Sequence, residues 1–94
     1  MASFTVRVEL HGADRADYDN LHQKMAAQGF SRTITAGDGK RYMLPPAEYY
    51  YEGSGATRST VLAKAKAAAS QVKTNFAVFV TEADGWTWYG LEAA

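Results

Sequence analysis

The chain has 94 residues, of which 47% are hydrophobic and 21% charged, and these values are typical of one small folded domain. Ten lysines and arginines balance ten aspartates and glutamates, which excludes the strong positive charge that marks many nucleic-acid-binding proteins. No cysteine is present, which excludes disulfides, thiolate nucleophiles and cysteine zinc sites.

The first predicted element is a strand that ends at about residue 11. Its apolar positions alternate with polar ones, which is the period of a strand with one buried face: Phe4, Val6, Val8 and Leu10.

A helix is predicted over about 14–28. Asp14 is a suitable N-cap, and Gly29 stands where a left-handed C-cap is needed. Between them, apolar side chains recur on one face at helical spacing: Tyr18, Leu21 and Met25.

The middle of the chain predicts a β-hairpin. A strand over about 30–35 and another that begins near Arg41 are joined by a tight Asp-Gly turn within 36–40. The two prolines at 45–46 cannot donate hydrogen bonds to a neighbouring strand, so they predict a bulge or break before the strand resumes at 48–52.

A second helix is predicted over about 58–72, with Thr57 as its N-cap. The strand that follows, over 75–81, is apolar on both faces, so each face should be covered. Residues 86–89 alternate in polarity and could form a short fifth strand that covers it, within the same chain or across a dimer.

This order of elements predicts an α+β fold. Right-handed crossovers place both helices on one face of an antiparallel four-stranded sheet, which is the ferredoxin-like βαββαβ sandwich. No apolar run approaches the roughly 20 residues of a membrane span, and the first residues lack a secretion signal. We expect a single domain over 1–94, in the cytoplasm and without a membrane partner.

Two histidines are the only side chains whose ordinary pKa lies near neutrality. His11 ends the first strand and His22 lies in the middle of the first helix. Such a pair could cleave RNA by general acid–base catalysis, one residue taking the 2′-hydroxyl proton and the other protonating the leaving oxygen. The alternative is that both are ordinary half-exposed polar residues.

A metal site is weakly indicated. Glu9, His11 and Asp14 are close in sequence and could hold a hard cation, but no tight ligand motif is present and Asp14 is expected to cap a helix. We therefore predict no metal and no cofactor.

The predicted hairpin carries Arg32, Lys40 and Arg41, which could hold phosphate groups or could serve only as solubilising charges. Exposed aromatic side chains can stack on single-stranded bases or form a homodimer interface. Tyr50, from the run at 49–51, and Trp88 are the candidates for this role.

Five segments suggest a family: Val-Arg-Val-Glu-Leu-His at 6–11, Gly-Phe-Ser-Arg-Thr-Ile at 29–34, Leu-Pro-Pro-Ala-Glu-Tyr at 44–49, Val-Thr-Glu-Ala at 80–83 and Trp-Thr-Trp-Tyr-Gly-Leu at 86–91. Together they resemble GhoS-type proteins of bacteria and prophages. The resemblance implies a ferredoxin-like antitoxin of a type V toxin–antitoxin system, an endoribonuclease that cleaves its toxin's messenger RNA. Where the named antitoxin of that family carries arginines along its first helix, this chain has Asn20 and His22.

The leading hypothesis is therefore a GhoS-like, metal-independent endoribonuclease of single-stranded mRNA that forms a homodimer. His22 and His11 would exchange protons, Arg32 and Arg41, with Lys40, would hold phosphate, and Tyr50 or Trp88 would stack on a base. The alternative is a non-catalytic interaction module or inhibitor of prophage or mobile-element origin, which dimerises or binds a host or phage protein.

Overall fold

The computed structural model of the chain describes residues 2–83, 85 and 87–94. These residues form two helices and five strands, in this order along the chain: β1 (Ala2–Leu10), α1 (Arg15–Ala27), β2 (Thr33–Thr35), β3 (Arg41–Met43), β4 (Glu48–Gly53), α2 (Arg58–Ser70) and β5 (Phe76–Glu82). This order agrees with the α+β class expected from the sequence.

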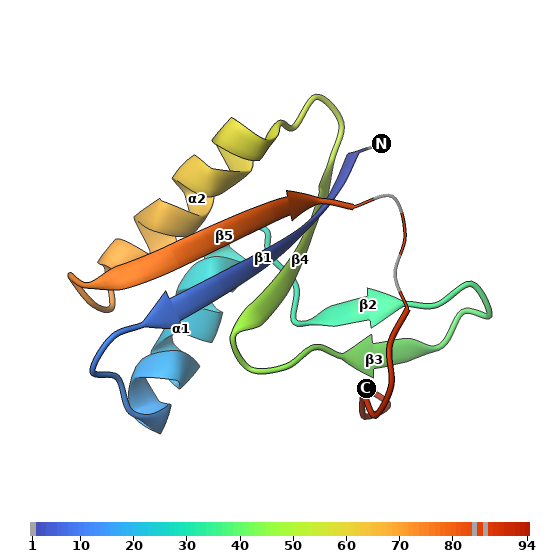
Figure 1. The fold of residues 1–94 in the computed structure, drawn as a ribbon, viewed down its shortest axis with the longest axis horizontal. Helices are drawn as coiled ribbons and strands as arrows, with labels where there is room; N and C mark the ends of the chain where they lie inside the picture. The colour runs from blue at the N-terminus through green and yellow to red at the C-terminus, as the bar shows by residue number, and fades with distance from the viewer. Residues whose placement is uncertain (1, 84, 86) are drawn as a thin grey trace.

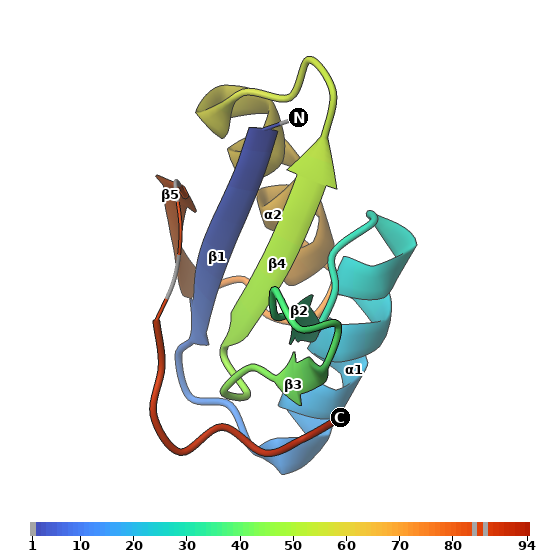
Figure 2. The same cartoon turned by 90° about the vertical axis from the view of Figure 1, so that its right-hand side faces the viewer.

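The main sheet has three antiparallel strands in the order β4-β1-β5, and both helices lie on the same face of it (Figures 1 and 2). The even-numbered positions of β1 turn toward the helices and form the centre of the hydrophobic core, together with Leu21, Met25 and Tyr49. The odd-numbered positions face the opposite, helix-free side of the sheet, which we call the open face.

Both ends of α1 follow from particular residues. The Asp14 side chain accepts a hydrogen bond from the Asp17 amide, and the Asp17 carboxylate accepts one from the Asp14 amide, which makes a capping box. At the other end, Gly29 has a φ of +92° and the Phe30 amide donates to the Met25 carbonyl, as in a Schellman motif. The predicted limits of this helix are confirmed.

Helix α2 begins at the predicted N-cap, because the Thr57 side chain accepts a hydrogen bond from the Thr60 amide. Its inner face is built from small side chains that are fully buried: Val61, Ala65, Ala68 and Ala69. These short side chains let the helix lie close to β1 and β5.

The four-stranded sheet expected from the sequence is replaced by two sheets, because β2 and β3 form a separate two-stranded hairpin. On the edge of β4 that faces away from β1, Ser31 is the only described residue that pairs, through two backbone hydrogen bonds to Tyr50 of 2.8 Å each. The Ser31 hydroxyl then accepts the Thr33 amide at 3.1 Å and competes with further pairing to β4. The two prolines at 45–46 separate β3 from β4.

The C-terminal segment also departs from expectation. The predicted strand at 86–89 includes Trp86, which lies outside the described residues, and residues 87–89 have no strand conformation. Residues 92–94 instead lie along β3: the Met43 amide donates to Glu92, and the Ala94 amide to Arg41. The C-terminus therefore extends the hairpin and leaves β5 at the end of the main sheet (Figure 1).

Within the part of the chain that the structure describes, no helix combines the length and the apolar character that crossing a membrane requires.

Candidate functional site

A cluster of three side chains joins α1, the start of the hairpin and β4. His22 is half-buried on α1, Arg32 immediately precedes β2, and Tyr49 is fully buried in β4. The distance from His22 Nδ1 to Tyr49 Oη is 2.6 Å, and that from His22 Nε2 to Arg32 Nη1 is 2.9 Å. Two of the predicted site residues, His22 and Arg32, are therefore in direct contact.

The hydrogen bonds of the cluster determine where the imidazole carries its proton. A guanidinium can only donate, so His22 Nε2 must accept the bond from Arg32. The neutral ring then carries its hydrogen on Nδ1 and donates it to the Tyr49 hydroxyl oxygen. Protonation of Nε2 would direct its N–H at the Arg32 guanidinium and would place two positive charges side by side.

The environment favours the neutral forms of both rings. Desolvation lowers the pKa of His22 below 6.5, and the Arg32 charge lowers it further, although Asp19 acts in the opposite direction. Burial likewise raises the pKa of the Tyr49 hydroxyl far above its ordinary value, despite the attraction of Arg32. At neutral pH the cluster is thus a neutral imidazole and a neutral phenol beside one guanidinium.

The Arg32 guanidinium uses some of its N–H groups in hydrogen bonds and leaves another without a partner among the described residues. Its Nη2 donates to the Leu44 carbonyl at 2.9 Å, and its Cζ lies 5.9 Å from the centre of the Tyr49 ring. The buried Nε atom has no hydrogen-bond partner among the residues that the structure describes. An unpartnered buried N–H is costly, so this guanidinium retains capacity for a further acceptor.

Two hollows meet at this guanidinium. One, of about 510 Å³, lies along α1 and is lined by Arg15, Tyr18, Asp19, His22, Arg32 and Pro46. We call it the α1 groove. Arg15, Tyr18, Asp19 and His22 recur at helical spacing and so occupy one face of α1.

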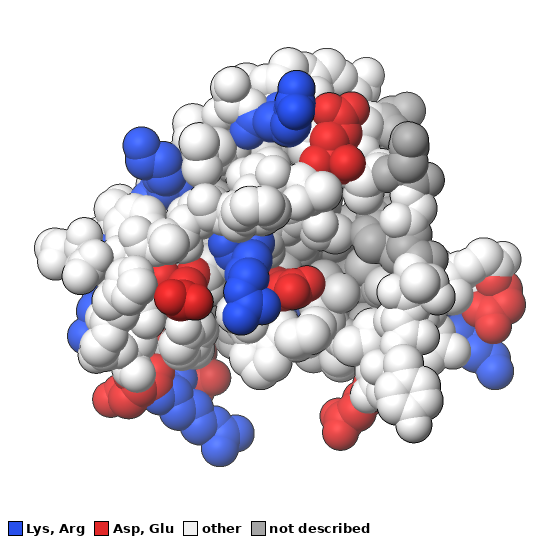
Figure 3. Space-filling view, viewed as in Figure 1, with Lys and Arg blue, Asp and Glu red and all other residues white. Residues whose placement is uncertain are grey.

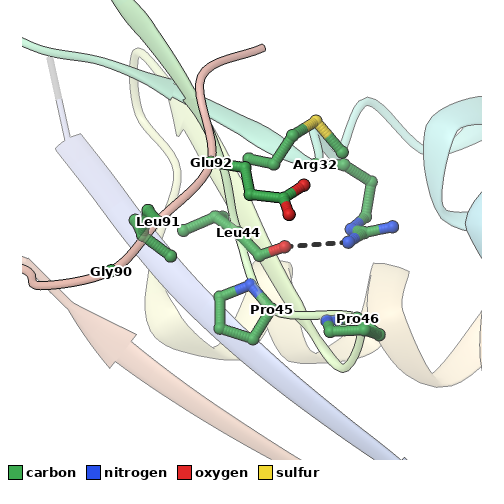
Figure 4. A pocket seen from close by; sticks show the side chains of 8 residues that line it. Arg32, Leu44, Pro45, Pro46, Gly90, Leu91 and Glu92 are labelled. Carbon is green, nitrogen blue, oxygen red and sulfur yellow. Dashed lines mark hydrogen bonds between the residues drawn. The ribbon is translucent and has the colours of Figure 1, made fainter.

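The second hollow, of about 360 Å³, lies on the other side of Arg32 between the hairpin and the C-terminal segment. Figure 4 shows the Arg32 guanidinium and the Glu92 carboxylate both directed into it, with the Arg32–Leu44 hydrogen bond at its wall. We call it the C-terminal pocket. Arg32 and Pro46 belong to both hollows, so a ligand in either one could reach the guanidinium.

The remaining predicted polar residues lie outside the cluster. His11 is exposed in the turn after β1, and no hydrogen bond or ring contact among the described residues joins it to His22. Lys40 and Arg41 are exposed on the hairpin, where Arg41 Nη2 donates to Thr33 Oγ1 at 2.8 Å. The structure thus brings Arg32, but neither of these two cations, to the histidine.

The two predicted stacking residues lie on different parts of the molecule. Tyr50 is on the open face, where its hydroxyl hydrogen-bonds to the Glu52 carboxylate and lies 3.3 Å from Ser3 Oγ. Desolvation is the main cause that raises the pKa of Tyr50. Trp88 packs against Tyr42 of β3, with ring centres 5.2 Å apart.

The weakly indicated metal site does not form among the described residues, where no three acidic or histidine side chains gather in ligand geometry. Asp14 instead has the capping role that its position predicts. The charges on the face shown in Figure 3 are of both signs and scattered, and no broad basic patch covers that face.

Sequence reasoning missed two members of the site. Tyr49 was one of three consecutive tyrosines, and only the register of β4 shows that it turns inward to His22. Tyr18 was assigned to the apolar stripe, yet it also lines the α1 groove. The spacing of four residues between Tyr18 and His22 was a usable signal, because such residues are neighbours on a helix.

Comparison of the chain with family models, with curated proteins and with solved structures found no match.

Proposed function

We propose that the chain is a GhoS-like, metal-independent endoribonuclease that binds single-stranded RNA in the α1 groove. The observation that carries this proposal is the pairing of a neutral imidazole acceptor with a guanidinium whose Nε lacks a partner. Together they supply a base and a phosphate ligand within hydrogen-bond distance of each other.

Arg32 binds the phosphate in this proposal. A guanidinium recognises phosphate through two parallel N–H bonds, which is a stronger arrangement than its bond to neutral His22. When Arg32 turns toward a phosphate, it releases His22 Nε2. The lone pair that becomes available is the one that a general base needs, and desolvation, the main cause of the lowered pKa of His22, continues to favour the unprotonated ring.

His22 then removes the proton from a ribose 2′-hydroxyl. The resulting oxygen attacks the adjacent phosphorus, the bond from phosphorus to the 5′ oxygen breaks, and a 2′,3′-cyclic phosphate forms. The departing 5′ oxygen takes a proton from the Tyr18 hydroxyl, whose oxygen accepts the Leu10 amide at 3.1 Å and whose own hydrogen is not used in that bond. Solvent carries the proton from His22 back to Tyr18.

The strand arrangement supports a ferredoxin-like fold as part of this proposal. The order β4-β1-β5 places the first strand between the third and the last of a βαββαβ chain. Ser31 pairs with Tyr50 on the outer edge of β4, where the second strand of that fold belongs. In this view β2 is a second strand that leaves the sheet after one residue.

RNA cleavage in the presence of EDTA tests the proposal. Purified protein is incubated with single-stranded RNA, beside the His22→Gln, Arg32→Gln and Tyr18→Phe variants. Lys66→Gln, on the exposed side of α2, is the matched control for loss of one positive charge. We expect cyclic phosphate ends from the parent protein and from Lys66→Gln, with a loss of about 100-fold or more in the His22 and Arg32 variants.

Equal RNA loss in all samples would identify a contaminating nuclease and contradict the proposal. Abolition of cleavage by EDTA would contradict the metal-independent mechanism. If Tyr18→Phe lowers the cleavage rate by less than about threefold, Tyr18 is not the proton donor, and the roles proposed for His22 and Arg32 are unaffected.

The open face favours a second candidate, a non-catalytic interaction module. Phe79 on this face has 70% of its surface exposed, which is unusual for a large apolar side chain in the middle of a strand. A protein that leaves RNA intact in the assay above but forms a stable complex through this face would fit the second candidate and exclude the first.

A further inference from the structure

The outer edge of β5 presents unpaired backbone groups in a regular row. At the two ends of the strand, the Ala83 amide donates to Ser3 at 2.8 Å and the His11 amide donates to Asn75 at 3.0 Å. The odd-numbered residues of this segment therefore direct their backbone groups toward β1, because direction alternates along an antiparallel strand. The even-numbered residues 76, 78, 80 and 82 direct theirs outward.

Apart from the charge of Glu82 at its end, this strand has none of the residues that usually prevent strands from pairing. Phe76–Glu82 contains no lysine, proline or glycine, and its first five residues are apolar. The opposite edge of the sheet differs, because Ser31 pairs there with β4. The C-terminal segment, which could have covered β5, lies along β3 instead.

Apolar surface flanks the edge on both sides. On the open face, Phe79 is 70% exposed, and on the helix side Leu62 is 36% exposed. A shallow hollow of about 240 Å³ connects these two side chains around the rim of β5, with Val78 and Val80 in its lining. An added strand would therefore bury side chains on both faces as well as pair the backbone.

We propose that a second copy of this chain adds its β5 to this edge in antiparallel orientation, about a two-fold axis at Phe79. In this register Phe79 lies opposite Phe79 of the second copy, and Val78 lies opposite Val80 of the second copy. The outward groups of 76, 78, 80 and 82 then pair with one another, and the two sheets join into a continuous six-stranded sheet.

The distribution of charge selects a second copy in this orientation. Glu82 is at one end of β5, and Lys73, which precedes the other end, is already paired with the Asp17 carboxylate of α1 at 3.3 Å. An antiparallel copy keeps the two Glu82 carboxylates at opposite ends of the paired strands, whereas a parallel copy would place Glu82 beside its own equivalent. The apolar centre is its own complement, because the residues on either side of Phe79, Val78 and Val80, are both valines.

Cysteine cross-linking tests this register, because the chain has no cysteine of its own. In the proposed dimer the two Phe79 positions form a pair not joined by backbone hydrogen bonds, with Cα atoms about 4.5 Å apart, within the disulfide range. Phe79→Cys should therefore form a covalent dimer under mild oxidation that reductant reverses. Thr81→Cys, on the same face, places its two thiols about 13 Å apart and should remain monomeric on a non-reducing gel.

Sedimentation equilibrium supplies the second measurement. The parent chain should dimerise with increasing concentration, and Phe79→Lys should sediment as a folded monomer because it sets two positive charges opposite each other. Tyr89→Lys, which changes a fully exposed aromatic residue elsewhere, should dimerise as the parent does. A parent chain that stays monomeric, or a cross-link at 81 but not at 79, would overturn the proposal.

Discussion

Two neighbouring side chains determine where the His22 imidazole carries its proton. Arg32 can only donate, so it fixes the Nδ1–H form of His22, and Tyr49 receives that hydrogen in the core. The lone pair of His22 Nε2 is therefore occupied as long as Arg32 donates to it. This arrangement makes the histidine a better candidate for a base than for an acid.

The lowered pKa of His22 predicts how stability depends on pH. Because the folded-state pKa lies below the ordinary 6.5, the unfolded chain binds a proton first as the pH falls. The free energy of unfolding should therefore be highest above 6.5 and should decrease from 6.5 down to the folded-state pKa. Urea unfolding on both sides of 6.5 measures this slope.

His22→Gln should flatten that part of the pH profile, since glutamine does not titrate. A profile that is equally steep in His22→Gln and in the parent protein would show that other groups cause it.

At the scale of elements, the parts of the structure that sequence predicts are those set by local chemistry. Asp14, Gly29 and Thr57 each satisfy backbone groups within a few residues, so both limits of α1 and the start of α2 could be predicted, whereas α2 ends at Ser70, before the predicted limit at about 72. The alternation of β1 and the break at the two prolines are equally local. These signals do not depend on where the rest of the chain goes.

The structure differs from the sequence-based prediction where a local hydrogen bond competes with pairing to a distant part of the chain. The Ser31 hydroxyl satisfies Thr33 and ends the pairing with β4, and no pattern in the sequence ranks these two options. The His22–Tyr49 contact spans 27 residues and depends on the register of β4. For the same reason the sequence identified His22 and Arg32 as candidates but could not show that they meet, and it paired His22 with His11.

The C-terminal segment leads to a prediction about RNA affinity. Its pairing with β3 directs the Glu92 carboxylate into the C-terminal pocket, which is also lined by Arg32, the residue that would bind phosphate (Figure 4). Removing this negative charge should strengthen RNA binding about fivefold, which corresponds to about 1 kcal/mol. Fluorescence anisotropy with a labelled single-stranded RNA compares Glu92→Gln with the parent protein.

Glu82→Gln removes an equal charge from the end of β5 and is the matched control, with no change expected in RNA affinity at a concentration where both proteins have the same oligomeric state. If Glu92→Gln binds RNA no better than the parent protein does, Glu92 does not act on the Arg32 phosphate site.

The whole molecule has a net charge of zero, and acidic and basic side chains alternate on the face seen in Figure 3. Binding that depends on Arg32 and few other cations should release few counterions. The slope of log K against log salt concentration should therefore be shallow, about −0.7 for each phosphate engaged and about −1 to −2 in total. Anisotropy titrations over a range of salt concentrations measure it.

A slope steeper than about −4 would require many simultaneous phosphate contacts. The described surface has no such basic array on the face shown, so that result would direct attention to the hairpin cations Lys40 and Arg41 as an additional RNA-binding surface.

The most direct test of the central claim is the NMR titration of the two histidines, without and with a non-cleavable 2′-O-methyl oligoribonucleotide. We expect a His22 pKa below 6.5 in the free protein and an increase when RNA is bound, because a phosphate draws Arg32 away and adds negative charge. The His11 resonances, from the exposed turn after β1, are the internal control and should not shift when RNA binds. RNA binding that leaves the His22 resonances and pKa unchanged would contradict the claim that Arg32 and His22 form the phosphate site.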